Sequence, residues 1–192
     1  MTSRDYGNID IYLNSLLGDL YSQPPDAGHI QMLRECFTNW IPQLIGVKNV
    51  LDVGCGEVAI AKPFFEQLNI KYTGITLGKE AIVARKRGKN VLNMDMNFLE
   101  FDDNSFDLIW ARHTLEHSPM PLITLMEWHR VCNMFFCLIV PNPDHYGRVG
   151  RNHYSVLYND QWKFLLERAG FHVIWEDYSN STEYRLMSEK KK

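Results

Sequence analysis

Residues 50–61 read VLDVGCGEVAIA and run from an apolar strand pattern through two glycines into a helical pattern. Gly54 and Gly56 have no Cβ, so the backbone there can turn sharply and approach a ligand closely. Their spacing fits G-x-G-x-x-A, which is typical of a turn that holds the phosphates of a dinucleotide. Asp52, two residues before the first glycine, would put a carboxylate beside those phosphates. The stretch therefore predicts a ligand site but leaves open whether the ligand is a dinucleotide or a cation.

The totals describe one ordinary folded domain. A chain of 192 residues with 45% hydrophobic and 22% charged residues can bury a core of its own and is too short for two typical domains. The formal net charge of -3 provides no broad positive field, so a nucleic-acid partner is unlikely on this ground. The only charge run, Lys190 to Lys192, is typical of a solvated tail.

The sequence shows neither a signal-peptide pattern nor a membrane-spanning apolar run. The first ten residues, MTSRDYGNID, lack the basic start and apolar run of a signal peptide, and the longest apolar run, residues 134–140, is too short to span a membrane. The four cysteines form no C-x-x-C pair, and most of them sit in apolar patterns. We expect a cytoplasmic protein with reduced thiols and no membrane contact.

From residue 47 onward, strand patterns alternate with helical patterns, which predicts an α/β fold with a mostly parallel sheet and helices on both of its faces. We expect one compact domain, in which N-terminal cap helices in residues 1–46 precede a core of residues 47–192. In such sheets the ligand lies beyond the carboxyl ends of the strands, where strand order reverses. The expected strands are 49–53, 71–75, 91–94, 106–111, 135–140 and 171–175, and the expected core helices are 59–68, 79–87, 121–131 and 160–169.

The residues after the second strand help to choose between the two ligands. A dinucleotide site usually has an acidic residue about twenty positions beyond the glycines to bind the ribose, but this position holds Thr76. S-adenosylmethionine carries a sulfonium and an ammonium and has no phosphate. In a partly buried cleft, Asp52 attracts such a cation by a few kcal/mol. Asp52 therefore favours S-adenosylmethionine over NAD.

At this point VLDVGCGEVAIA resembles the glycine motif of class I S-adenosylmethionine-dependent methyltransferases. Residues 93–96 (NMDM), the run from Phe101 to Val131 and the run from His153 to Val173 resemble later blocks of that family in the same order. The resemblance implies a Rossmann-like sheet of seven strands with an antiparallel last strand, residues 182–188. It also implies S-adenosyl-L-methionine as cofactor and methyl transfer as activity. The cofactor contacts that it implies are Asp52, Gly54, Gly56, Thr76, Leu77, Asp95, Met96 and Arg112, with Asp95 and Met96 at the adenine and Thr76 at the ribose.

Two positions depart from the family pattern. Val58 stands where the family usually has a third glycine, and Thr76 stands where it usually has an acidic residue. A valine does not adopt positive φ cheaply, and one hydroxyl accepts less from a ribose than a carboxylate does. Weaker cofactor binding is the expected consequence. A protein that binds the cofactor but is catalytically inactive, acting as a regulatory partner, is therefore the alternative function. The segment Gly74-Ile75-Thr76-Leu77 also resembles the G-x-T-L segment of the cyclopropane-fatty-acid synthase branch, which uses the same cofactor.

Residues 113–117 spell H-x-x-E-H, an inverted zinc-protease signature. Pro119 pushes the preceding residue out of the helical region, so a helix that carries both histidines would break almost at once. Some methyltransferases of this class, including ubiquinone-pathway O-methyltransferases, hold a divalent ion with acidic residues and the histidine of this block. Here His113 replaces one of those acids, and we assign no metal. Glu116 and His117 are as well explained by orienting the loop below the cofactor.

The long segment between the fifth strand and the next helix, residues 141–158, is the predicted substrate lid, since loops of this length are usually functional or disordered. His145 and His153 are candidate bases there, and His117 is a third catalytic candidate, because histidine titrates near neutral pH. Arg148 and Arg151 would attract an anionic acceptor. We expect a small-molecule acceptor, methylated on oxygen, nitrogen or carbon, and the sequence leaves the oligomeric state open.

Overall fold

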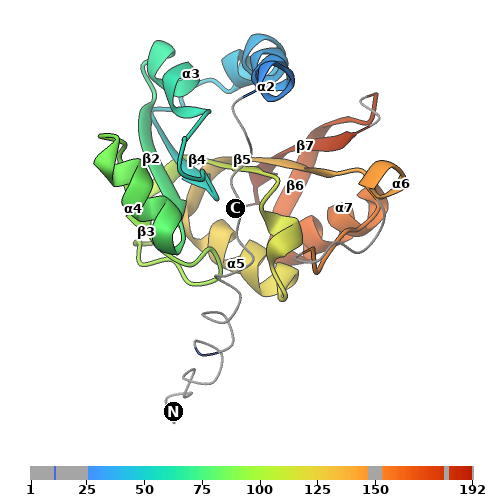
Figure 1. Ribbon diagram of the computed structural model, residues 1–192. Helices are drawn as coiled ribbons and strands as arrows, with labels where there is room; N and C mark the ends of the chain where they lie inside the picture. Colours follow the sequence, from blue (N-terminus) through green and yellow to red (C-terminus); the bar gives the residue numbers. More distant parts are fainter. Residues whose placement is uncertain (1–10, 12–25, 147–152, 180–181, 192) are drawn as a thin grey trace.

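The computed structural model describes residues 11, 26–146, 153–179 and 182–191. Within them, seven strands form a single sheet in the order β3-β2-β1-β4-β5-β7-β6 (Figure 1). The strands are β1 (Asn49–Val53), β2 (Lys71–Thr76), β3 (Val91–Asn93), β4 (Phe106–Arg112), β5 (Cys132–Pro141), β6 (Phe171–Asp177) and β7 (Glu183–Lys190).

The first five strands run parallel to one another, and β7 runs antiparallel to both β5 and β6. This confirms the expected Rossmann-like sheet, mostly parallel, with an antiparallel last strand. After β3 the chain returns across the sheet to pair β4 with the free edge of β1. Strand order thus reverses between β1 and β4, which places the binding crevice at the carboxyl ends of these two strands.

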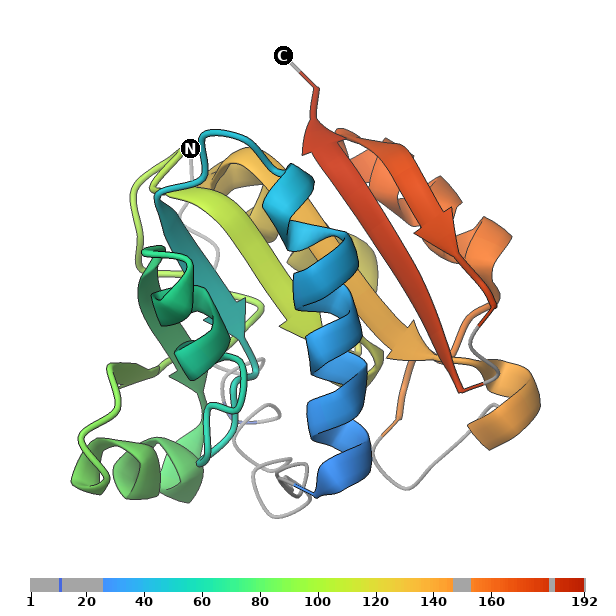
Figure 2. The ribbon, with the colours of Figure 1, turned by 90° about the horizontal axis from the view of Figure 1, so that it is seen from above.

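Helices cover both faces of the sheet, as expected (Figure 2). The side chains of the central strands alternate between two cores: Leu51 and Ile109 belong to one, and Val50 and Leu108 belong to the other. Because successive strand residues point to opposite faces, this alternation shows that both faces are buried. The core of Leu51 packs against α5 (Pro121–Val131) and α7 (Asn159–Ala169), and the core of Val50 packs against α2 (Ala27–Asn39), α3 (Lys62–Gln67) and α4 (Gly78–Lys86).

The helix α2 is part of the same globule as the core. Its N-cap Asp26 accepts a hydrogen bond from the backbone N–H of His29 at 3.0 Å, which satisfies one of the free donors at the helix start. Leu33, Cys36 and Phe37 then recur at helical spacing and are buried against the sheet. The first cap helix expected from the sequence lies outside the described residues, apart from position 11. The division at residue 46 therefore stays a prediction.

Most helix and strand positions agree with the sequence patterns, and one helix start does not. The helix expected from Ala59 begins only at Lys62, because Ala59 adopts a left-handed φ of 49° and residues 57–61 form turns. A short helix, α6 (Pro143–Tyr146), follows β5 and was not expected. Two short 3-10 helices, η2 (Ile41–Gln43) and η3 (Leu115–His117), complete the elements. No helix in the described part of the chain is both long and apolar enough to cross a bilayer.

Gly170, after α7, offers a test of this packing. It has a φ of +100°, and a Cβ there would lie 2.7 Å from Nε2 of His129. We predict that Gly170→Ala lowers the free energy of unfolding by more than about 1–2 kcal/mol, since backbone strain and overlap add. Gly88→Ala is the matched control, because Gly88 has a φ of +71° but open space around it. In urea unfolding, Gly88→Ala should lower the free energy of unfolding only by the backbone strain. Equal decreases for the two variants would contradict the packing argument.

Candidate functional site

Two adjoining pockets open at the carboxyl ends of β1, β2 and β4, and they share Gly54, Glu80 and His113. We call them the β1 pocket and the β2 pocket, and both together the cleft. The β1 pocket is lined by Leu33, Asp52, Gly54, Cys55, Gly56, Val58, Ile60, Ala61, Glu80, Trp110, Arg112 and His113. The β2 pocket is lined by Gly54, Ile75, Thr76, Leu77, Glu80, Met94, Met96, His113, Thr114 and His117.

The glycine turn forms the border between the two pockets. Gly54 and Gly56 both have left-handed φ values, +73° and +62°. The backbone N–H groups of Gly54 and Cys55 donate to the carbonyl oxygen of Ile75 at 2.9 and 3.0 Å. A Cβ on Gly54 would overlap the side chain of Thr114, whose hydroxyl donates to the carbonyl of Val53. Gly54 is therefore required by the packing of the protein itself, in addition to any approach of a ligand.

The same turn argues against a dinucleotide. Phosphates bind where free backbone N–H groups and a helix N-terminus converge. Here two N–H groups of the turn are bonded to β2, and the next helix starts six residues after Gly56. The left-handed position after the glycines is Ala59, and Val58 is not among the residues with positive φ. The valine that departs from the family pattern therefore does not strain the turn.

Asp52 lies on β1 and lines the β1 pocket, only 4% exposed. The hydroxyl of Tyr72 on β2 donates to its Oδ2 at 2.6 Å. Burial raises the pKa of Asp52 to about 7, against the opposing influences of the Tyr72 hydrogen bond and the positive charge of Arg112. Asp52 is thus only partly ionised near neutral pH. The sequence predicted its place but not this environment, and a cation in the pocket would favour its charged form.

Glu80 is a site residue that the sequence reasoning missed. It lies in the first turn of α4 and lines both pockets. The hydroxyl of Thr76, at the end of β2, donates to Glu80 Oε2 at 2.8 Å. A carboxylate therefore lies beside Thr76 in the cleft, although it comes from a residue four positions later in the chain. An acidic residue in the first turn of the helix after β2 was the signal that could have revealed it.

The end of β4 carries a buried ion-pair network. Arg112 lines the β1 pocket, and its Nη2 donates to Glu183 Oε1 of β7 at 2.5 Å. His113 Nε2 lies 2.8 Å from the same oxygen. Burial alone would raise the pKa of Glu183, but His113 and Arg112 outweigh it and hold the pKa at about 2. Glu183 therefore balances the positive charge beside the cleft, and the sequence analysis did not identify it.

The expected catalytic histidines separate into two groups. His117 lines the β2 pocket, and the ring of His153 packs against it with 4.8 Å between ring centroids. His145 lies exposed on α6 and lines neither pocket. Asp95 also lines neither pocket, and its Oδ1 accepts hydrogen bonds from both the backbone and the side-chain amide of Asn97. Arg148 and Arg151 lie outside the described residues.

The H-x-x-E-H segment does not form one helix. His113 has a left-handed φ of 50° and precedes η3, so the two histidines of the signature do not share a continuous helical face. The single helix that a zinc-protease signature requires is therefore interrupted at His113. A non-glycine residue with positive φ that lines both pockets is the kind of backbone strain that often accompanies functional sites.

Known proteins resemble the chain in the same region. A family model described as a methyltransferase domain matches residues 51–134. Over this part the chain is similar to methyltransferase domains. The match begins at Leu51 in β1 and includes the glycine turn, β2, β3, β4, η3 and α5.

Three known proteins show the same similarity. A probable methyltransferase of Aspergillus luteorubrus, ltbC, is 29% identical over 109 residues, which are 47% of this chain and only 38% of that relative. A crystal structure of an S-adenosylmethionine-dependent methyltransferase from Archaeoglobus fulgidus has a TM-score of 0.68 at 17% identity, over 84% of this chain and 94% of that one. Human N-acetylserotonin methyltransferase, solved in complex with S-adenosylmethionine, has a TM-score of 0.67 at 14% identity, over 83% of this chain and 52% of that one. The two structures share the methyltransferase fold.

The raised pKa of Asp52 makes stability depend on pH. The folded state holds a proton on Asp52 up to about pH 7, whereas the unfolded state releases it near 3.8, the ordinary pKa of an aspartate side chain. Stability is therefore lost as the pH rises between these values. We predict that Asp52→Asn gains roughly 2 kcal/mol relative to the wild type between pH 5 and pH 8, as measured by urea unfolding. A difference that stays constant with pH would contradict the buried, protonated carboxyl.

Proposed function

We propose that the cleft binds S-adenosylmethionine and that the protein transfers its methyl group to a small-molecule acceptor. The observation that carries this proposal is the pair of carboxylates, Asp52 and Glu80, that line one cleft beside a glycine turn whose N–H groups already bond to β2. Such a cleft attracts a cation and offers little to a phosphate. The four cysteines are free thiols, which fits the expected cytoplasmic compartment.

The two pockets suit the two ends of the cofactor. In the proposed pose the amino-acid end lies in the β1 pocket, where Asp52 attracts its ammonium and Gly54 and Gly56 allow close approach. The adenosine end lies in the β2 pocket, which is rich in apolar side chains such as Leu77 and Met96. There the Thr76 hydroxyl and the Glu80 carboxylate are placed to bind the ribose hydroxyls. The adenine contact of Asp95 stays a prediction from the sequence.

When bound, S-adenosylmethionine supplies an electrophilic methyl group on a positively charged sulfur. The protein's part is to hold an acceptor atom in line with that methyl group and to keep the acceptor unprotonated. His117 lines the β2 pocket and His153 packs on it, so these two imidazoles are the proposed groups on the acceptor side. His145 stays a prediction without a described place at the cleft. An acceptor that carries negative charge would suit Arg148 and Arg151 of the lid segment.

The inactive regulatory partner is less well supported than it was by the sequence. Its two reasons were Val58 and Thr76. Val58 does not occupy a left-handed position, and Thr76 is joined to the carboxylate of Glu80. Both departures from the family pattern therefore have a structural counterpart that leaves the cleft intact.

Cofactor binding is tested by thermal unfolding with S-adenosylhomocysteine, the product of methyl transfer. A ligand at one hundred times its dissociation constant stabilises the folded state by about 2.7 kcal/mol, and we expect a rise of several degrees in the midpoint. NAD at the same concentration is the control and should leave the midpoint unchanged. The proposed cofactor would be overturned if NAD raised the unfolding midpoint and S-adenosylhomocysteine did not, or if neither compound raised it.

Methyl transfer itself requires a product. Incubation of the purified protein with S-adenosylmethionine carrying a labelled methyl group and a small-molecule extract should place the label in a low-mass product. Replacing His117 with Gln should reduce this labelling while the stabilisation by S-adenosylhomocysteine persists. Stabilisation without labelling of any extract would favour the inactive partner.

Glu80 can be tested separately from Asp52. We predict that Glu80→Gln weakens S-adenosylhomocysteine binding by about tenfold or more, because a carboxylate accepts from two ribose hydroxyls and an amide oxygen from fewer. Thr76→Val, which removes the hydroxyl that holds Glu80, should have a smaller effect in the same direction. Isothermal calorimetry measures both. Unchanged affinity in Glu80→Gln would remove Glu80 from the ribose site.

A further inference from the structure

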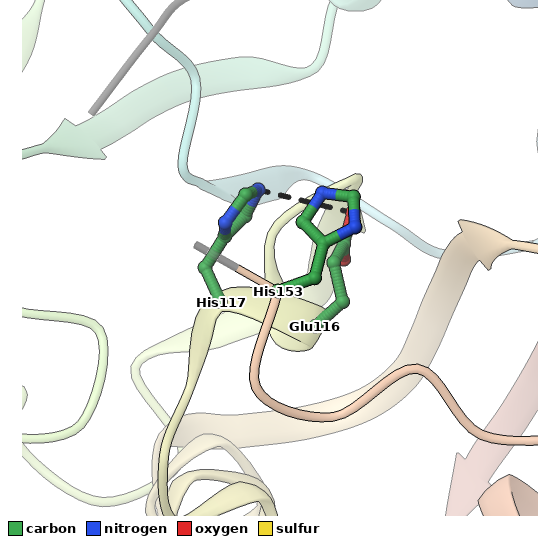
Figure 3. Close-up of side chains that lie close together, drawn as sticks. All are labelled: Glu116, His117 and His153. Carbon is green, nitrogen blue, oxygen red and sulfur yellow. Dashed lines mark ion pairs between the residues drawn. The ribbon is translucent and has the colours of Figure 1, made fainter. Parts of the chain in front are cut away.

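Three potential metal ligands from two distant parts of the chain meet at the rim of the β2 pocket. Glu116 and His117 belong to η3, and His153 lies in the segment before α7. One ligand atom of each lies within 4.8 Å of the others. Figure 3 shows the two imidazoles and the carboxylate turned toward one another. Of the three, only His117 also lines the pocket.

Backbone hydrogen bonds hold His153 at this place. The N–H groups of Tyr154 and Ser155 donate to the carbonyl oxygen of Glu116 at 2.8 and 3.0 Å. The Ser155 hydroxyl donates to the carbonyl of Ser118 at 3.0 Å. The chain next to His153 is thus bonded to the middle of η3 and to the residue that follows it. These bonds bring the backbone of His153 next to η3, within reach of the side chains of Glu116 and His117.

Glu116 is the unusual member of the cluster. It is fully buried, and neither carboxylate oxygen accepts a hydrogen bond from the residues that the structure describes. The imidazoles of His113 and His117 approach its Oε1 only to 3.5 and 3.9 Å, which are ion-pair distances. A buried carboxylate whose oxygens accept no hydrogen bond is costly even beside two imidazoles, and a bound ion would offset that cost.

We propose that Glu116, His117 and His153 form a binding site for a divalent transition-metal ion. Two imidazole nitrogens and one carboxylate oxygen suit zinc, iron, cobalt or nickel, whereas magnesium and calcium prefer oxygen ligands alone. In a tetrahedral site with bonds of about 2.1 Å the ligand atoms lie about 3.4 Å apart. Rotation of the two partly exposed imidazoles by roughly 1.4 Å at their ring atoms closes the difference from 4.8 Å.

Three protein ligands leave a coordination position for water or for a further ligand. An ion at this place would lie next to the cleft, because its ligand His117 also lines the β2 pocket. It would also join η3 to the segment before α7. The inference does not rest on methyl transfer, because metal binding is measured without any cofactor. It also gives the buried carboxylate of Glu116 a role that the proposed methyl transfer does not use.

The test is calorimetric titration of chelator-treated protein with ZnCl2, and with CoCl2 followed by absorption. We expect about one ion per chain, and a cobalt spectrum without the strong thiolate-to-metal band that cysteine ligands would give. His117→Gln, His153→Gln and Glu116→Gln should each lower zinc affinity by at least about tenfold. His172→Gln, on the exposed side of β6, is the matched control and should bind as the wild type does.

His153→Gln is decisive if Glu116→Gln does not fold, because His153 is only partly buried. Folding of each variant is checked by its stabilisation with S-adenosylhomocysteine, or by urea unfolding if that ligand does not bind. The proposal is overturned if the wild type binds no zinc or cobalt, if His153→Gln binds as the wild type does, or if the cobalt spectrum shows thiolate ligands. Binding of magnesium in preference to zinc would also overturn it.

Discussion

The site depends on how the turn after β1 is fastened. Two N–H groups of that turn bond to the carbonyl of Ile75 on one side, and Thr114 rests on the bare Cα of Gly54 on the other. These contacts join the ends of β1, β2 and β4, which the parallel register places side by side. These ends of the strands are therefore held by hydrogen bonds and packing within the protein itself. Asp52 on β1 and Glu80 after β2 are positioned by the same contacts.

The cleft is lined by acidic groups beside the glycine turn and by a balanced ion-pair network at the end of β4. Asp52 and Glu80 give the cleft its acidic character, while Glu183 balances Arg112 and His113 at the end of β4. Burial of Asp52 costs stability when it is ionised, and a bound cation would recover part of that cost. An apolar residue at position 52 would avoid the cost of burying a charge, but it would not attract a cation. A buried carboxyl at this position is therefore consistent with a site that binds a cation.

The sequence predicted the features that depend on local pattern. Strand β1 and helix α5 have the predicted bounds, because each is a continuous apolar or periodic run with a clear start. The start of α3 was wrong because residues 59–61 fit a helical pattern, yet Ala59 turns the other way. Glu80 and Glu183 were missed for other reasons. Glu80 is only four residues from Thr76, and its acidic side chain in the first turn of α4 was a local signal that the sequence analysis did not use. Glu183 belongs to a strand 71 residues after Arg112, and no local motif reveals that contact.

Strand β7 lies inside the sheet, between β5 and β6, although β6 precedes it in the chain. During synthesis β6 therefore leaves the ribosome before the strand that connects it to the sheet exists. Until β7 arrives, one edge of β5 is open to pairing with other chains, and Arg112 lacks the carboxylate of Glu183. Arg112 of the cleft therefore gains its carboxylate partner in the same late step that completes the sheet.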